Sequence, residues 1–485
     1  GETDTSAEAG PVVDSTDLKT YISTLGSDEF EGRMPFTAGE TKTLEYLTAE
    51  FESMGLEPGN GDSYLQPVPL VDINGTPDPV LLIEGPDTSL RLQYKEDFMI
   101  NTRREADRVE IEDSELVFCG YGIVAPEYGW NDYKDIDMTG KTAVVLVNDP
   151  GFESEDSTFF KGKTMTYYGR WTYKIEEAAR QGAEGLLIIH QTVPAGYPWF
   201  VVRTSWAGSQ QHLPSKEGDF HSAMTGWISL SATASLLRAA PMKETRLFEQ
   251  AKSPDFKPIP LGLTVSGAIE NKVKKDVSQN VIARITGSKY PDEYIIYVAH
   301  WDHLGVGAPV KGDSIYNGAM DNATGTGSLM AIAKAFAEME EKPERSVLFL
   351  AVTAEEQGLL GSAYYAQNPI YPVEKTVALI NMDGANVHGP MKDFTITGFG
   401  QSEMDDYARA EAEKQGRYVQ PEQEPEKGFF FRSDQFSFAK VGVPALYGKG
   451  GYDHLTKGKE YAMAKKEEYT STNYHQPSDE YDEAS

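Results

Sequence analysis

The sequence contains a single cysteine, Cys119, among its 485 residues. One cysteine cannot form an intrachain disulfide, and it excludes thiolate zinc fingers and iron–sulfur clusters, which need several. Basic residues are also scarce, because 44 Lys and Arg stand against 75 Asp and Glu, for a formal net charge of −31. A surface this acidic repels phosphate backbones, so nucleic acid is not an expected partner. The chain has no run of 18 apolar residues, so no membrane-spanning segment is predicted.

Several catalytic signatures are missing as well. The chain has no G-x-x-x-x-G-K-[ST] loop, no H-E-x-x-H pair and no G-x-S-x-G turn. Its G-x-G pairs lack the third glycine of a dinucleotide-binding fingerprint. These absences argue against P-loop nucleotide hydrolysis, zincin-type proteolysis, serine-hydrolase chemistry and dinucleotide binding.

The composition that remains is that of an ordinary globular protein, with 40% hydrophobic and 25% charged residues. A chain of 485 residues exceeds what one core usually organises, so at least two domains are expected. The first residues, GETDTSAEAG, lack the basic and apolar regions of a signal peptide, and residues 1–14 are predicted to be a flexible stalk. The acidity and this start predict an extracytoplasmic bacterial protein (periplasmic, secreted or tethered at the cell envelope), with its signal segment not present in this chain.

Three further segments follow the stalk. Residues 15–114 combine helical apolar spacing with short strand-like runs, and residues 115–267 have a β–β–α–β pattern typical of a separate domain. In residues 268–485, apolar strands alternate with helices, which predicts an α/β sheet with both faces covered. The strands expected in this last segment are 294–299, 346–352 and 377–380.

Imidazoles and carboxylates gather directly after these predicted strands. Since open α/β sheets build their sites at the carboxyl ends of their strands, we expect these side chains to converge. Such a nitrogen and oxygen donor set suits zinc and is large enough for two ions that share a bridging carboxylate. The candidate residues are His300, Asp302, His303, Asp321, Glu355, Glu356, Asp383 and His475.

Two alternatives stay open at this point. Any one of these residues taken alone is more simply a cap, a turn residue or a solvated side chain. Spacing also does not decide whether His300 or His303 is the ligand in the first motif.

Five motifs carry a resemblance to a known family. HWDHLG, GAMDNATGTG, TAEEQGLLGS, INMDG and NYHQPSDE resemble, in order, the successive motifs of the M28 family of di-zinc metallopeptidases, which are mostly aminopeptidases. The early loop EGRMPFTAGE is similar to the entry of that family. The segments GYGIVAPEYGWNDY, GKTAVVLVNDPG and YKIEEAARQGAEGLLII resemble the protease-associated (PA) domain inserted in some members. The resemblance implies a zinc-exopeptidase fold, with a central mixed and largely parallel sheet covered by helices, plus an inserted β-rich α/β PA domain.

The resemblance also implies a role for each matching residue. His300 and Asp383 are expected to bind one zinc, Glu356 and His475 the other, and Asp321 to bridge both. Asp302 is expected to orient His300 by accepting its other ring N–H, and Glu355 to act as general base. The family often has a non-proline cis peptide after the bridging aspartate, which here is Asp321–Asn322.

The implied activity is that of a zinc-dependent aminopeptidase, which hydrolyses N-terminal residues of peptides through a zinc-bridged hydroxide. Tyr474 or Tyr447 is a candidate contact for the oxyanion or the substrate. One alternative is a di-zinc carboxypeptidase of glutamate carboxypeptidase type, for which Arg432 is the candidate contact to a substrate carboxylate. Another is a catalytically inactive, receptor-like binding protein; a glutaminyl cyclase-like single-zinc transferase is less favoured.

Overall fold

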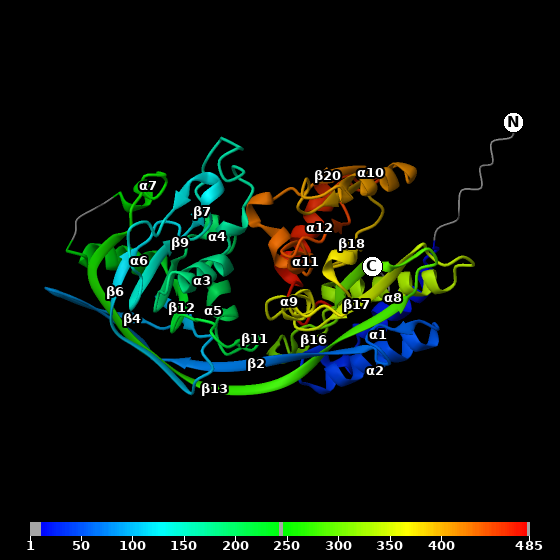
Figure 1. The fold of residues 1–485 in the computed structure, drawn as a ribbon, viewed down its shortest axis with the longest axis horizontal. Coiled ribbons are helices and arrows are strands. Elements are labelled where there is room, and N and C mark those ends of the chain that lie inside the picture. The colour runs from blue at the N-terminus through cyan, green and yellow to red at the C-terminus, as the bar shows by residue number, and fades with distance from the viewer. Residues whose placement is uncertain (1–10, 242–245, 483–485) are drawn as a thin grey trace. The chain divides into compact units, whose positions relative to one another are not determined.

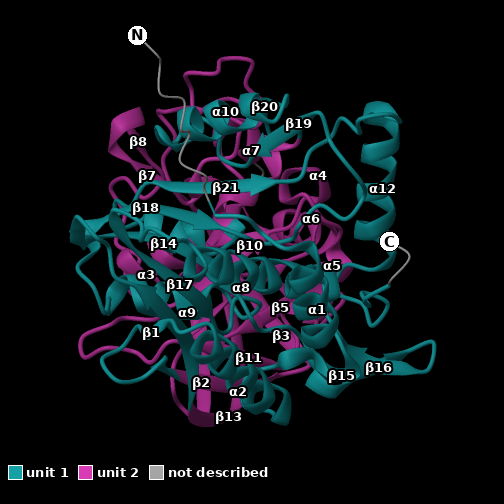
Figure 2. Cartoon of the chain, turned by 90° about the vertical axis from the view of Figure 1, so that its right-hand side faces the viewer, with its two compact units in different colours: residues 1–69, 277–423, 432–485 teal, residues 70–276, 424–431 magenta. Residues whose placement is uncertain are grey.

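The computed structural model describes residues 11–241 and 246–482, and the chain divides into two compact units (Figures 1 and 2). Unit 1 comprises residues 1–69, 277–423 and 432–485, and unit 2 comprises residues 70–276 and 424–431. Most of the predicted stalk lies outside the described residues, since only positions 11–14 of it are described. Among the described residues, no helix combines the length and apolar character needed to cross a membrane.

Unit 1 contains a mixed sheet whose centre is parallel. β14 (Tyr290–His300) lies between β17 (Arg345–Val352) and β18 (Thr376–Asn381), and both pair with it in parallel. These strands coincide with the three apolar runs of the sequence and confirm the predicted α/β fold. β21 (Ala445–Lys449) adds to β18 in parallel, and the end of β13 (Ile259–Ile285) pairs with β17 in antiparallel orientation.

The helices of unit 1 cover both faces of this sheet, which explains why its central strands are almost uniformly apolar. Successive residues of β17 point to opposite faces. Phe349 packs in a core with residues of α1, α2 and α8, while Leu348 and Leu350 pack with residues of α9 and α11. The helices are α1 (Ser15–Leu25), α2 (Ala38–Ser53), α8 (Thr324–Ala337), α9 (Leu360–Gln367), α10 (Met404–Lys414), α11 (Gln435–Ala439) and α12 (Gly458–Thr472). The remaining strands are β1 (Glu57–Pro58), β15 (Gly305–Val310), β16 (Asp313–Tyr316), β19 (Asp393–Ile396) and β20 (Tyr418–Pro421). Of these, β15 and β16 pair with each other in a separate sheet.

Unit 2 contains a further set of paired strands and its own apolar cores. Three of its strands, β6, β9 and β10, are consecutive parallel neighbours, and β12 continues the series in parallel on β10. Its strands are β2 (Leu65–Pro77), β3 (Val80–Gly85), β4 (Thr88–Gln93), β5 (Phe98–Asn101), β6 (Arg108–Phe118), β7 (Val124–Ala125), β8 (Trp130–Asn131), β9 (Lys141–Leu146), β10 (Gly185–Ile189), β11 (Ser209–His212), β12 (Met224–Ile228) and the first part of β13. Its helices are α3 (Trp171–Arg180), α4 (Thr192–Ala195), α5 (Trp199–Ser205), α6 (Leu230–Ala239) and α7 (Leu247–Gln250).

The boundaries of unit 2 differ from the expected domain at 115–267. The unit begins at Leu70, because β3 pairs with β13 and β5 pairs with β12, so these early strands belong to its sheet. The expected boundary near residue 268 falls inside β13, which contributes residues to both units, as does β2. Both strands are drawn as long curved arrows in Figure 1. The resemblance of this region to a PA domain stays a prediction.

Candidate metal centre

The parallel centre of the unit 1 sheet brings three functional segments to one edge. His300 is the last residue of β14 and lies opposite Val352, the last residue of β17, while Asn381 at the end of β18 lies opposite Val298. Glu355 and Glu356 follow β17 after a short turn, and Asp383 follows β18. The side chains that follow these strands are therefore delivered to the same carboxyl edge, as the sequence predicts.

A fourth segment supplies Asp321 from the turn that precedes α8. The Asp321–Asn322 peptide is cis, as the family resemblance implies. The Asn322 amide donates to the carbonyl of Met382 at 3.0 Å, and its oxygen accepts the backbone N–H of Gly384 at 3.0 Å. Asn322 thereby ties the turn that carries Asp321 to the loop that carries Asp383.

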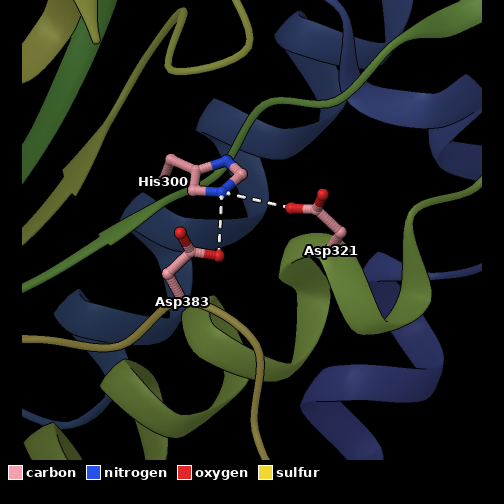
Figure 3. Close-up of side chains that lie close together, drawn as sticks. All are labelled: His300, Asp321 and Asp383. Carbon is pink, nitrogen blue, oxygen red and sulfur yellow. Dashed lines mark ion pairs between the residues drawn. The ribbon is translucent and has the colours of Figure 1, made fainter. Parts of the chain in front are cut away.

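His300, Asp321 and Asp383 form a first group of metal-binding geometry (Figure 3). Nε2 of His300 lies 3.3 Å from Oδ1 of Asp321 and 3.6 Å from Oδ1 of Asp383. This nitrogen is buried and makes no hydrogen bond of ordinary geometry. Donors about 2.0–2.1 Å from a tetrahedral zinc lie about 3.3–3.4 Å apart. The three donors are therefore spaced to fit a zinc ion.

A second group lies on the other side of Asp321. Nε2 of His475 is 3.3 Å from Oδ2 of Asp321 and 3.1 Å from Oε2 of Glu356. The two oxygens of Asp321 thus face different imidazoles, which is the arrangement that a bridging carboxylate needs.

His303 is close to the same second group. Its Nδ1 lies 2.7 Å from Oε1 of Glu356, and His303, Asp321 and Glu356 also have metal-binding spacing. Both histidines that spacing left open thus lie in a candidate metal-binding group, His300 with Asp321 and Asp383, and His303 with Asp321 and Glu356.

The electrostatics of the cluster follow from four partly exposed carboxylates around a few imidazoles. Burial raises the pKa of Glu355 well above its ordinary value, with Asp383 and Glu356 adding to the rise and His300 opposing it. Burial also acts to raise the pKa of Glu356, but His475 and His303 outweigh it and lower that pKa to about 2. Burial lowers the pKa of His475, whereas Glu356 and Asp321 raise it, for a net rise to about 10. The site thus concentrates negative charge that cations stabilise.

Asp302 acts through two different groups. The Nδ1 atom of His300 lies 3.1 Å from the backbone carbonyl of Asp302, whereas the carboxylate oxygen is 3.6 Å away. The carboxylate instead accepts the backbone N–H groups of Glu355 at 3.0 Å and Glu356 at 3.3 Å. The expected contact to His300 is therefore made by the backbone of Asp302, and its side chain orients the turn that carries both glutamates.

Two residues that sequence reasoning did not single out support the site. The buried guanidinium of Arg33 donates to the carbonyls of Trp301, Asn317 and Gly318 at 2.8, 2.6 and 2.9 Å. Asp479 accepts the backbone N–H of Asp321 at 3.1 Å. Both lie in segments that resemble family motifs, EGRMPFTAGE and NYHQPSDE, but those resemblances gave neither residue a role.

The remaining predicted contact residues differ in how they approach the candidate metal ligands. The hydroxyl of Tyr447 is buried and donates to Oδ2 of Asp383 at 3.3 Å, so here it contacts a candidate ligand. The ring of Tyr474 stacks on His475 with centroids 3.9 Å apart, and this residue is 46% exposed. Arg432 directly precedes Ser433, whose hydroxyl donates to Oδ2 of Asp383 at 2.6 Å.

Comparison with known proteins relates part of this chain to a family of peptidases. The model of Peptidase family M28 matches residues 280–485. Aminopeptidase NAALADL1 of Mus musculus is 33% identical over 143 residues, which cover 28% of this chain and 18% of the mouse protein. A probable zinc metalloprotease of Pyrenophora tritici-repentis (strain Pt-1C-BFP) is 33% identical over 126 residues, 25% of this chain and 26% of that protein. The aligned part therefore spans well under two thirds of either relative.

The fold has a solved counterpart as well. The aminopeptidase from Aneurinibacillus sp. strain AM-1 superposes with a TM-score of 0.51 at 20% identity, covering 96% of this chain and 88% of that one. This chain therefore shares the fold of that structure. Residues 280–485, which match the model of Peptidase family M28, carry all five candidate metal ligands.

Proposed function

We propose that the chain is an aminopeptidase that binds two zinc ions and removes N-terminal residues from peptides. The observation that carries the proposal is the position of Asp321, whose two oxygens lie 3.3 Å from His300 and 3.3 Å from His475. His300 and Asp383 would hold one ion, and His475 and Glu356 the other. When bound, two zinc ions would polarise a peptide carbonyl and lower the pKa of a water molecule.

Glu355 is placed to handle protons in this reaction. Its Oε2 lies 3.9 Å from Nε2 of His300, so the carboxylate faces the cluster without joining either metal-binding group. Asp302 fixes its backbone, which orients the side chain toward the reacting centre. We assign Glu355 to accept the proton of the attacking water and to deliver it to the departing amine nitrogen.

The negative charge of the site supports an aminopeptidase rather than a general endopeptidase, because it would attract the free N-terminus of a peptide. An α-ammonium group is cationic, and the cluster holds four carboxylates within a small volume, namely Asp321, Glu355, Glu356 and Asp383. A blocked N-terminus lacks this charge and loses the corresponding attraction. The relatives named as aminopeptidases agree with this assignment.

The test combines zinc analysis with a substrate panel. The purified chain should contain two zinc ions, cleave aminoacyl p-nitroanilides, and leave N-blocked peptides intact. Removal of metal by a chelator should abolish hydrolysis, and added zinc should restore it. Release of C-terminal residues from N-blocked peptides would instead establish the carboxypeptidase, and a chain that binds no zinc would establish the binding protein.

A further inference from the structure

A pocket of about 380 Å³ opens beside the candidate metal centre in unit 1. One wall is the segment that begins with Gly384, the residue after Asp383. Another is the end of β21, from Gly448 to Gly450, which follows Tyr447. Because Tyr447 donates to Asp383, both walls start at a candidate metal ligand or its hydrogen-bond partner. A substrate held at the metals therefore has this pocket within reach.

The charge of the pocket is opposite to that of the protein. The chain carries a formal net charge of −31, yet the lining includes Arg417 and Lys449 and no Asp or Glu. Its remaining lining is apolar or uncharged and includes Met391 and Phe394. A cationic pocket of mixed lining suits a ligand group that combines a short apolar stem with a negative charge.

The positive charge of Arg417 is not neutralised by a neighbouring acid. Its Nη2 donates to the backbone carbonyls of Asp393 at 2.6 Å and Gly450 at 3.0 Å, which are uncharged acceptors. Across residues 11–241 and 246–482, no carboxylate lies within ion-pair distance of it. Nε of Arg417 is buried and has no hydrogen-bond partner.

Lys449 links the pocket to the metal centre. Its Nζ lies 5.1 Å from the centre of the Tyr447 ring. The hydroxyl of the same tyrosine donates to Asp383, so Lys449 lies beside a side chain that contacts a candidate metal ligand.

The walls of the pocket are held in place by packing and hydrogen bonds. A Cβ atom on Gly448 would lie 2.0 Å from Cζ of Phe394, so only glycine lets this ring pack against β21. The Asp393 carboxylate accepts the backbone N–H groups of Tyr452 and Asp453 at 2.9 and 2.8 Å, which fixes the loop after Gly450. The pocket is therefore preformed, and binding would not require the walls to order.

We propose that this pocket binds a carboxylate group of the substrate through Arg417 and Lys449. The inference rests on the proposed peptidase function and adds a substrate class to it. Two sources supply that chemistry: the acidic side chain of an N-terminal Glu or Asp, or the terminal carboxylate of a dipeptide. Guanidinium and ammonium groups are the strongest side-chain donors to carboxylates.

The test compares substrates that differ only in the carboxylate. Glu p-nitroanilide is compared with Gln p-nitroanilide, and the dipeptide Leu-Gly with its C-terminal amide, while Leu p-nitroanilide serves as a reference without any carboxylate. A charge-assisted contact in a preformed pocket should raise kcat/KM about tenfold for one of the two acids over its neutral partner. An advantage of Glu identifies the side chain as the source, and an advantage of Leu-Gly identifies the terminus.

Variants of the two cationic residues test whether the preference for the acid arises in this pocket. Lys449→Met should reduce the advantage of the acid several-fold, and Lys449→Glu should reverse it; each ratio of acid to neutral partner is taken within one variant, so that a change in its overall rate cancels. Because Arg417 also holds Gly450, Arg417→Lys is compared with Arg417→Met to separate the charge from the wall contacts. Lys414→Met, on the exposed face of α10 where Lys414 pairs with Glu411, is the matched control and should keep the full preference.

The outcomes separate this inference from the proposed function. Hydrolysis of Leu p-nitroanilide without any advantage for either acid overturns the pocket assignment and leaves the aminopeptidase standing. Failure to hydrolyse any aminoacyl substrate overturns the aminopeptidase, and the pocket is then tested by calorimetry of two pairs of ligands on the zinc-loaded protein: glutamate against glutamine, and Leu-Gly against its C-terminal amide. Equal binding within both pairs, or a preference that survives Lys449→Glu, overturns the pocket assignment.

Discussion

Replacing Asp479 by Asn should weaken zinc binding without touching any candidate ligand. The Asp479 side chain is buried, and its oxygens accept the backbone N–H groups of Met320 at 3.0 Å and Asp321 at 3.1 Å. The second oxygen also accepts the hydroxyl of Tyr469 at 3.1 Å. The amide of Asn has one acceptor oxygen, so its NH2 group would face one of the N–H or O–H donors that the carboxylate of Asp479 accepts.

The expected loss of zinc affinity follows from the lost hydrogen bond to the Asp479 carboxylate. A hydrogen bond to a charged group contributes about 1.5–3 kcal/mol, which corresponds to roughly a 10- to 150-fold change in a binding constant. Because Asp321 is the candidate bridge, displacement of its backbone should weaken both metal-binding groups together. Tyr469→Phe removes one neutral donor and keeps both backbone contacts, so it should cost about 0.5–1.5 kcal/mol at most.

Zinc affinity is measured by competition with a chelating dye, and hydrolysis is measured at limiting and at saturating zinc. Asp479→Asn should need more zinc for half-maximal activity and should approach normal kcat once zinc is in excess. Asp406→Asn, which changes an exposed carboxylate on α10, is the matched control and should bind zinc normally. If Asp479→Asn bound zinc within about threefold of the unmodified chain, the claim that Asp479 positions the bridge would be refuted.

Three further predictions concern the base, the bridge and the acid stability of unit 2. Glu355→Gln should retain both zinc ions and lose about 10²–10⁴-fold in kcat, because only proton transfer is removed; near-normal turnover would contradict the base assignment. Asp321→Asn should lose metal and activity together, and elemental analysis that still finds two zinc ions would contradict the bridging role. Burial, with help from Arg103 and His221, lowers the pKa of His212 to about 3, so the unfolded state takes up the proton first as pH falls below about 6.5. The free energy of unfolding should therefore decline between about pH 6.5 and 3. Measured by urea unfolding, the decline between pH 7 and 5 should be roughly 2 kcal/mol smaller for His212→Gln than for the unmodified chain. Equal declines in the two proteins would contradict a neutral buried His212.

Much of the metal centre was predictable because its residues sit at recognisable places in the pattern. His300 and Asp383 come at the end of apolar runs, Glu356 follows another, and Asp321 opens a helix. Parallel strands deliver their carboxyl ends to one edge, so the topology places these side chains together once the strands are identified. The α/β fold of unit 1 was predictable for the same reason.

The limits of unit 2 were not predictable from local pattern. Its strands β3 and β5 belong to it through pairing with β13 and β12, which come more than a hundred residues later in the chain. A short apolar run has the same appearance whichever strands it pairs with, so local pattern assigned these strands to residues 15–114, whereas their pairing groups them with unit 2.

The sequence by itself determined which side chains are candidates for the chemistry, because metal ligands and a general base require particular residue types. The tertiary structure alone decided how they are held. Arg33 acts on carbonyls 268 and 284 residues away, and Asp479 on an N–H 158 residues away. Every residue except proline has both a backbone N–H and a carbonyl, so the sequence does not show which of these groups Arg33 and Asp479 contact. The different partners of His300 and His303, and of the carbonyl and carboxylate of Asp302, likewise depend on distances that exist only after folding.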